Sequence, residues 1–309
     1  MTLANFYSSN TTAGPITAAM ELVCPVNSLS TLRAAVDHGA DWIRLDHRAH
    51  NQTEEMRDLN PDYAVLIRRG IRYAHDRRSR VLFAIETDEQ ASSWSSLRDM
   101  IDLVAQCGVD AVALSDPSLL LYAAAQHPQL SLHYEAHEDC IDHDTINFFH
   151  QRFGVARALL PRVLTLAQVA HLAANTQVEL QVTGFGRQCS LVTPSSGPSL
   201  DGLRLRAHDA RSIGNTPGPH LCGATERAAN DNCFTLDKPP DTSVLTLLPQ
   251  LTSLGVRAIQ AEALEHGPVY LAQVMQVWRE AVDECLENLD HYAVKPSWIA
   301  ELRRASPHR

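Results

Sequence analysis

The chain has 309 residues, of which 45% are hydrophobic and 20% charged, and this composition is typical of a globular protein with a large buried core. Its formal net charge of -10 would repel a phosphate backbone, so the composition argues against a nucleic-acid partner. Residues 1–19 contain no Lys or Arg and no long apolar run, so we expect neither a secretory signal nor a membrane span there. We interpret this segment as a poorly ordered extension.

The cysteine count points to a reducing compartment. Seven cysteines are an odd number, and they are spread along a chain without an export signal, so reduced thiols or metal ligands are favoured over a disulfide framework. Cys24, Cys107 and Cys285 fall within predicted strands or helices, and we interpret them as buried structural residues. The expected location is the cytoplasm.

From residue 21 onward, short runs rich in Val, Ile, Leu and Ala alternate with segments whose apolar residues recur every three or four positions. This alternation predicts eight β/α units, the number that closes a TIM-like (β/α)8 barrel. The predicted strands are Glu21–Pro25, Trp42–Asp46, Val81–Glu86, Ala111–Ser115, Ser131–His137, Ala156–Leu160, Val178–Thr183 and Val256–Glu262. The predicted helices are Leu29–His38, Pro61–Arg77, Ser96–Cys107, Ser118–Gln126, Asp142–Arg152, Thr165–Ala174, Ser243–Ser253 and Pro268–Glu287.

Residues 184–242 break this rhythm, because Gly, Pro, Ser, Thr and Asn cluster there without a sustained period. They predict a long irregular insertion after the seventh strand, and long loops on a regular scaffold usually carry function. The predicted organisation is therefore an extension at 1–19, a barrel domain at 20–290 that includes the insertion, and a C-terminal tail at 291–309. Three cysteines fall inside the insertion: Cys189, Cys222 and Cys233.

Polar and apolar residues alternate along the fifth predicted strand. Because successive side chains of a strand point to opposite faces, all its polar groups share one face. We expect that face to point into the barrel lumen and the apolar face to pack under the outer helices. The polar face consists of Ser131, His133, Glu135 and His137, and the apolar face of Leu132, Tyr134 and Ala136.

Acidic residues stand at the carboxyl ends of other predicted strands, the rim where barrel enzymes place their chemistry. They include Asp46, Glu86 and Glu262, and we take Glu86 and Glu262 as candidate catalytic residues. The only lysines, Lys238 and Lys295, lie beside prolines outside the strands, which disfavours Schiff-base chemistry.

The fifth strand also suggests a metal site. His133 and His137, with a carboxylate from Glu135, Asp46 or Glu86, could form a two-histidine, one-carboxylate site for a single iron, manganese or zinc ion. The alternative is a hydrogen-bonded polar network in the lumen.

Several stretches carry a family resemblance. They are Met20-Glu-Leu-Val-Cys-Pro25, Leu32-Arg-Ala-Ala-Val-Asp-His-Gly-Ala-Asp41, Gly70-Ile-Arg-Tyr-Ala-His75, Gln151-Arg-Phe-Gly154, Leu159-Leu-Pro-Arg-Val-Leu164, Gly184-Phe-Gly186, Leu247-Leu-Pro-Gln-Leu251 and Tyr270 to Val282. Together they resemble the UbiU-like proteins of anaerobic ubiquinone biosynthesis, in the collagenase-like peptidase U32 family, over most of residues 20–300.

The resemblance implies a barrel in which four cysteines hold a four-iron, four-sulfur cluster. It also implies oxygen-independent hydroxylation of a small aromatic substrate beside a homologous partner chain. Cys189 matches the first ligand and Cys222 the fourth, whereas Ser196 stands at the second position and residues 197–220 contain no cysteine. Two other cysteines could substitute if the insertion folds back over the barrel mouth: Cys140 and Cys233.

The family's last strand ends in a charged motif that is altered here to Gln260-Ala-Glu-Ala-Leu264, in which Glu262 alone matches. Three functions therefore stay open. The chain is a UbiU-like component of oxygen-independent hydroxylation, a mononuclear metalloenzyme with a lumen site, or a non-catalytic barrel partner or U32-type peptidase-like protein. No protease nucleophile and base are recognisable.

Overall fold

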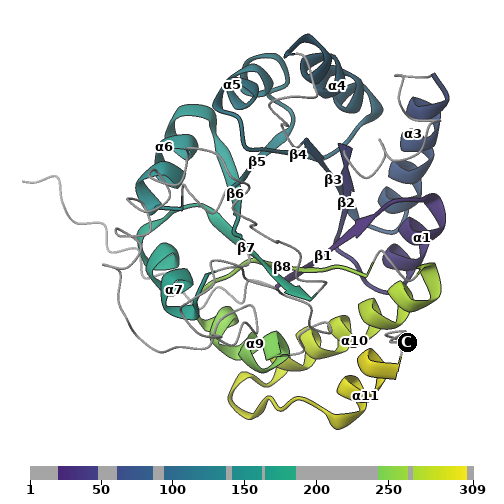
Figure 1. The fold of residues 1–309 in the computed structure, drawn as a ribbon, viewed down its shortest axis with the longest axis vertical. Helices are drawn as coiled ribbons and strands as arrows, with labels where there is room; N and C mark the ends of the chain where they lie inside the picture. Colours follow the sequence, from purple (N-terminus) through teal and green to yellow (C-terminus); the bar gives the residue numbers. More distant parts are fainter. Residues whose placement is uncertain are drawn as a thin grey trace, which may run out of the picture.

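A computed structural model describes residues 20–47, 61–85, 94–136, 141–161, 164–185, 243–263 and 267–304. Eight parallel strands close into a barrel in the order of the sequence, from β1 beside β2 round to β8 beside β1 (Figure 1). The predicted TIM-like (β/α)8 fold is therefore confirmed. The insertion was predicted from residue 184, but β7 continues to Phe185, and the rest of the predicted insertion, 186–242, lies outside the described residues.

The strands match the predicted runs closely. They are β1 (Glu21–Val26), β2 (Trp42–Asp46), β3 (Arg80–Ile85), β4 (Ala111–Leu114), β5 (Ser131–Glu135), β6 (Val155–Leu159), β7 (Glu179–Phe185) and β8 (Ala258–Ala261). Helices follow them around the outside of the barrel (Figure 1): α1 (Leu29–Asp37), α3 (Pro61–His75), α4 (Trp94–Cys107), α5 (Pro117–Gln126), α6 (His143–Phe153), α7 (Leu166–Asn175), α9 (Ser243–Ser253) and α10 (Gly267–Glu287). None of the helices described is both long and apolar enough to span a membrane.

Side chains at helix starts show why the helices begin where they do. The hydroxyl of Ser28 accepts a hydrogen bond from the backbone N–H of Thr31, while the Thr31 hydroxyl accepts one from the N–H of Ser28, so α1 opens with a capping box. Asp116 caps α5 ahead of Pro117, a residue that suits a first helical turn because it needs no N–H partner there.

The C-terminal segment contains more structure than the sequence pattern predicted. A short 3-10 helix, η3 (Leu289–His291), leads into α11 (Pro296–Arg304). Trp298 is buried on α11, and its indole N–H donates to Glu280 of α10 at 3.1 Å. This helix therefore packs on the outside of α10 and extends the ring of helices (Figure 1).

Apolar side chains pack on both faces of the barrel sheet, in an outer and an inner layer. The larger layer lies between the barrel and the helices and contains Leu132, Tyr134 and Ala136, so the predicted outward face of β5 is confirmed. The smaller layer fills the lumen, as expected for a barrel whose interior is packed rather than open. It consists of Val23, Trp42, Leu82, Ala84, Ala111, Ala113, Leu159 and Ala258. Charged side chains lie in the lumen at both ends of this smaller apolar layer.

Candidate functional site

A charged network occupies the lumen near the carboxyl ends of the strands. Arg44, in the middle of β2, is 5% exposed. Its Nε donates to Oδ1 of Asp46 at 2.7 Å and its Nη2 donates to Oε1 of Glu135 at 2.8 Å. The structure thus brings together two of the predicted site residues, from β2 and β5, through an arginine that sequence reasoning missed. The signal was present, because Arg44 shares the lumen face of β2 with Asp46 at a spacing of two residues.

The electrostatics of this network keep Arg44 charged. Burial lowers the pKa of its guanidinium, but the nearby carboxylates of Glu135 and Asp46 outweigh that effect and raise the pKa above its usual range. A buried cation between two carboxylates satisfies the rule that buried charges are paired. Because its charge is compensated, Arg44 fixes the position of the two carboxylates, whose side chains are partly exposed toward the barrel mouth.

A second set of polar groups joins β7 to the end of β8. Nε2 of Gln181 donates to Oε1 of Gln260 at 3.2 Å, and Nε2 of Gln260 donates to Oε1 of Glu262 at 2.6 Å. Glu262 follows β8 directly, so its predicted place at the carboxyl end of a strand is confirmed. Both glutamines are buried and Glu262 is partly exposed, which places the carboxylate at the mouth of the lumen.

His133 lies deeper, toward the amino ends of the strands. It is 2% exposed, and its ring packs edge-on against Trp42 with the ring centroids 5.4 Å apart. Burial lowers its pKa well below the usual value, and the positive charges of Arg157, Arg80 and Arg44 lower it further. His133 is therefore a neutral imidazole, held apart from the salt-bridged carboxylates of Asp46 and Glu135.

Nothing in the described ranges assembles the predicted metal site. Within these residues no three His, Cys, Asp or Glu side chains are grouped so as to hold a metal ion. Arg44 stands between Asp46 and Glu135, and His133 faces arginines. Two of the candidate residues, Glu86 and His137, lie outside the described residues, so the metal site stays a prediction.

The candidate cluster ligands lie outside the described residues as well: Cys140, Cys189, Cys222 and Cys233. The cysteines that the structure does describe, Cys24, Cys107 and Cys285, are all buried, and burial raises the pKa of each thiol. Cys24 packs between the barrel and the helices, which confirms the structural role predicted for it. Protonated thiols buried in separate places do not suit an iron-sulfur cluster, which requires thiolates.

The closed barrel, with charged side chains gathered at the carboxyl ends of its strands, defines a protein of the TIM-barrel class. The sequence model of peptidase family U32 matches residues 27–196 and 221–309, and the chain belongs to that family. The interruption of the match falls within the long insertion.

Individual relatives are distant. The tRNA hydroxylation protein P2 of Bacillus subtilis (strain 168) is 24% identical over 251 residues, which cover 78% of this chain and 80% of that protein. The tRNA hydroxylation protein P1 of the same organism is 18% identical over 303 residues, covering 94% of this chain and 69% of that protein. A solved structure described as native KDPGal shares the fold, with a TM-score of 0.51 at 10% identity over 86% of this chain and 96% of that chain.

Proposed function

We propose that this chain is a UbiU-like component of oxygen-independent hydroxylation, acting on an aromatic substrate of the quinone-precursor type. The observation that carries the proposal is the match to peptidase family U32 over residues 27–196 and 221–309, together with the similarity to P2 and P1, which are named for tRNA hydroxylation. The choice of a small ring over RNA rests on the net charge of -10, which disfavours a polyanion.

The residues of the lumen have defined tasks in this proposal. Asp46 and Glu135, fixed by Arg44, accept hydrogen bonds from ring hydroxyl groups and orient the substrate at the barrel mouth. Glu262, oriented by Gln260, is the candidate general base, since it stands at the carboxyl end of β8 and is partly exposed. Its counterpart Glu86 follows β3 in the sequence, outside the described residues.

A homologous partner chain belongs to this proposal. The cysteine set of this chain departs from the pattern implied by the UbiU-like resemblance, because Ser196 stands at one ligand position and residues 197–220 hold no cysteine. A related chain with a complete set would supply the iron-sulfur cluster, whose chemistry is electron transfer. The two B. subtilis relatives, P2 and P1, are both similar to this chain and occur in one organism, which supports a pairing of related chains.

The test is deletion of the gene followed by anaerobic growth and mass spectrometry of quinone precursors and of tRNA nucleosides. We expect the deletion to remove a hydroxylated quinone precursor. The parent chain should restore it, and Glu262→Gln should restore it at a rate at least tenfold lower, because the amide keeps the hydrogen bond to Gln260 but cannot take up a proton.

Glu284→Gln is the matched control, because Glu284 pairs with Lys295 on the outer surface, away from the lumen. This variant should restore the product fully. Loss of a hydroxylated tRNA nucleoside, with the quinone precursors unchanged, would instead assign the chain to the activity for which its relatives are named. No change in either product would overturn a hydroxylation role and favour a non-catalytic barrel subunit.

A mononuclear metalloenzyme is the alternative, and its metal site stays a prediction because Glu86 and His137 lie outside the described residues. The motivating observation is that His133 and Glu135 both face the lumen from β5. Asp46 hydrogen-bonds to the same arginine, Arg44, as Glu135 does. This alternative requires one metal ion per chain in the absence of any partner, so metal content separates it from the hydroxylation proposal.

A further inference from the structure

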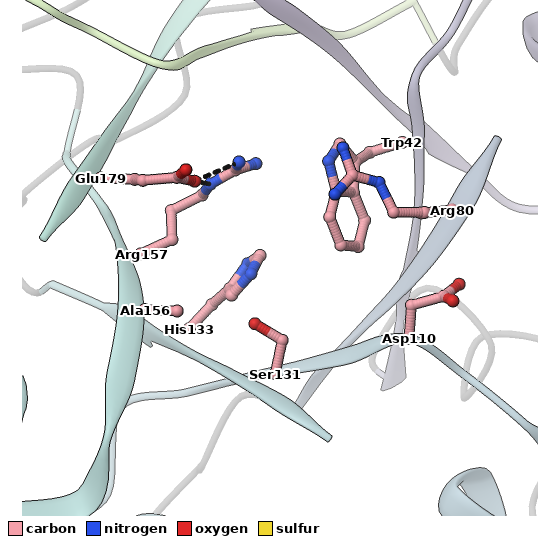
Figure 2. A pocket seen from close by; sticks show the side chains of 8 residues that line it. All are labelled: Trp42, Arg80, Asp110, Ser131, His133, Ala156, Arg157 and Glu179. Atoms are coloured by element: carbon pink, nitrogen blue, oxygen red, sulfur yellow. Dashed lines mark hydrogen bonds and ion pairs between the residues drawn. The ribbon is translucent and has the colours of Figure 1, made fainter. Parts of the chain in front are cut away.

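The amino ends of the strands hold a second polar site, at the opposite end of the lumen from Arg44 and Glu262. A cavity of about 350 Å³ opens there. Trp42, Arg80, Ser131 and Glu179, the first residues of four strands, line it together with Asp110, while His133 and Arg157 reach it from one strand step deeper (Figure 2). Its volume is about ten times the roughly 30 Å³ of a water molecule and lies within the range of small-molecule pockets.

Basic side chains surround the indole of Trp42 in this cavity. The guanidinium carbon of Arg80 lies 4.2 Å from the ring centroid and that of Arg157 lies 5.4 Å from it. The ring of His133 meets the same indole edge-on, and Figure 2 shows it directed into the space between Arg157 and Trp42. Cations over the faces of a tryptophan are held in place by the ring quadrupole, so this arrangement is preorganised.

Among the described residues, the partners of Arg157 engage only one edge of its guanidinium. Its Nε and Nη2 donate to Oε2 of Glu179 at 3.0 and 2.6 Å, and Nη2 also donates to Oε2 of Glu21 at 2.5 Å. Its Nη1 is buried and has no hydrogen-bond partner in the described part of the chain, although the residue is only 2% exposed.

Nδ1 of His133, another residue that lines this cavity, is also buried and has no partner among the residues described. Buried polar groups in native proteins are normally satisfied, and leaving one unpaired costs about 1–3 kcal/mol. The two atoms belong to paired residues of the adjacent strands β5 and β6, and both residues line one cavity, so a single hydrogen-bonding ligand would satisfy both.

The chemistry of the walls defines that ligand. Nη1 of Arg157 can only donate, so the ligand must present an acceptor. The carboxylates of the cavity are already engaged: Glu179 accepts from Arg157, and Asp110 accepts from His75 and from the backbone N–H of Val81. The charges of Arg80 and Arg157 are balanced by Glu21 and Glu179, so the cavity has no excess positive charge for a phosphate dianion, and two donors on adjacent strands match the paired oxygens of one carboxylate.

We propose that this cavity is a second ligand site, which binds a small monocarboxylate. The carboxylate oxygens accept hydrogen bonds from Nη1 of Arg157 and from Nδ1–H of His133, and Arg80, whose charge is paired with Glu21, lines the exposed rim. Guanidinium and carboxylate are matched in geometry and charge. The site is independent of the proposed hydroxylation, because none of its residues belongs to the network at the carboxyl ends of the strands.

The probe is sodium acetate, and the reporter is the indole N–H of Trp42, which donates to Glu21 at 2.8 Å beside the cavity. The chain has four tryptophans, so its indole signals in a nitrogen-15 correlation spectrum are few, and Trp42→Phe assigns the relevant one. We expect acetate to shift the Trp42 signal saturably while the Trp298 signal stays in place. Sodium chloride at equal ionic strength and acetamide, which has the same shape without the charge, should not shift it.

Arg157→Lys should weaken acetate binding at least tenfold, because lysine keeps the charge beside Glu21 but removes the guanidinium edge. Arg77→Lys is the matched control, since Arg77 pairs with Asp37 and stacks on Tyr73 outside the cavity, and it should bind acetate as the parent does. The proposal is overturned if acetate causes no saturable shift, if acetamide binds equally well, or if Arg157→Lys binds unchanged. Should Arg157→Lys fail to fold, the comparison of acetate with acetamide on the parent chain still decides.

Discussion

At the scale of single residues, two neighbouring side chains deep in the lumen are held in different ionisation states. His133 is kept neutral, because burial and the nearby arginines both lower its pKa. Glu21 is kept ionised: burial raises its pKa, but Arg157, Trp42 and Arg80 outweigh burial and the net effect is a lowered value. A neutral imidazole beside ionised pairs is suited to hydrogen bonding with a ligand rather than to forming a salt bridge.

His133 should make stability depend on pH. Its folded-state pKa lies below the unfolded value of about 6.5, so as the pH falls below 6.5 the unfolded chain gains a proton that the folded chain does not bind. We expect the free energy of unfolding to fall by up to about 1.4 kcal/mol per pH unit from this residue alone. Urea denaturation of the parent and of His133→Gln at about pH 7.0 and about pH 5.5 measures this free energy. The two pH values lie above and below the pKa of histidine in an unfolded chain.

Other groups titrate in both proteins, so the informative quantity is the difference between the two slopes. The parent should lose about 1 kcal/mol more than His133→Gln over that interval. Equal losses would show that His133 takes up a proton in the folded state and that its neighbours do not hold it neutral.

At the scale of elements, β7 and the long helix α10 approach so closely that one position excludes a side chain. A Cβ added to Gly184 would lie 2.6 Å from Cδ1 of Ile259 on β8 and 2.9 Å from the ring of Trp278 on α10, and both neighbours are completely buried. The Gly184-Phe-Gly186 stretch of the family resemblance therefore includes a glycine that packing requires. Because protein interiors are close-packed, the neighbours have little room to move.

Gly184→Ala should lower the free energy of unfolding by about 1–3 kcal/mol, the usual cost of overpacking a core. Gly70→Ala is the matched control, since the added methyl group would meet only the ends of flexible side chains, Cδ1 of Leu32 at 2.9 Å and Cδ2 of Leu29 at 3.6 Å, and the position lies inside helix α3, where alanine is favoured. Thermal unfolding of both variants is the measurement. Equal stabilities would contradict a tight contact of β7 with Ile259 and Trp278.

At the scale of the whole molecule, metal content distinguishes the proposed functions. Iron, sulfide, manganese and zinc should be quantified in anaerobically purified parent, His133→Ala and His137→Ala, with the exposed His171→Ala as control. In the hydroxylation proposal a partner chain supplies the cluster, so this chain purified alone should carry neither iron nor sulfide, and the variants should not differ from the parent. A mononuclear lumen site expects one metal without sulfide, reduced at least tenfold in the first two variants only. A colourless, iron-free protein would exclude a resident cluster.

Much of the fold could be predicted from the sequence, because alternating strand and helix periods are local properties. The strand order, the outward face of β5 and the rim position of Glu262 were all predicted. The helix α11 was missed, since its position depends on burial of Trp298 against α10, which is a tertiary contact. The cavity at the amino ends of the strands was also missed, because the active sites of barrel enzymes generally lie at the carboxyl ends, and the sequence was searched for a site only there.

The sequence by itself determined the barrel, the family resemblance and the polar face of β5, because periodicity places residues on faces without any knowledge of their neighbours. Only the tertiary structure decided which groups pair across the lumen. Arg44 and Glu135 are 91 positions apart, and Arg157 and Glu21 are 136 apart, yet both pairs are in hydrogen-bond contact. Closure of the barrel brings them together, and the proposed second ligand site rests on the atoms of Arg157 and His133 that have no partner among the described residues.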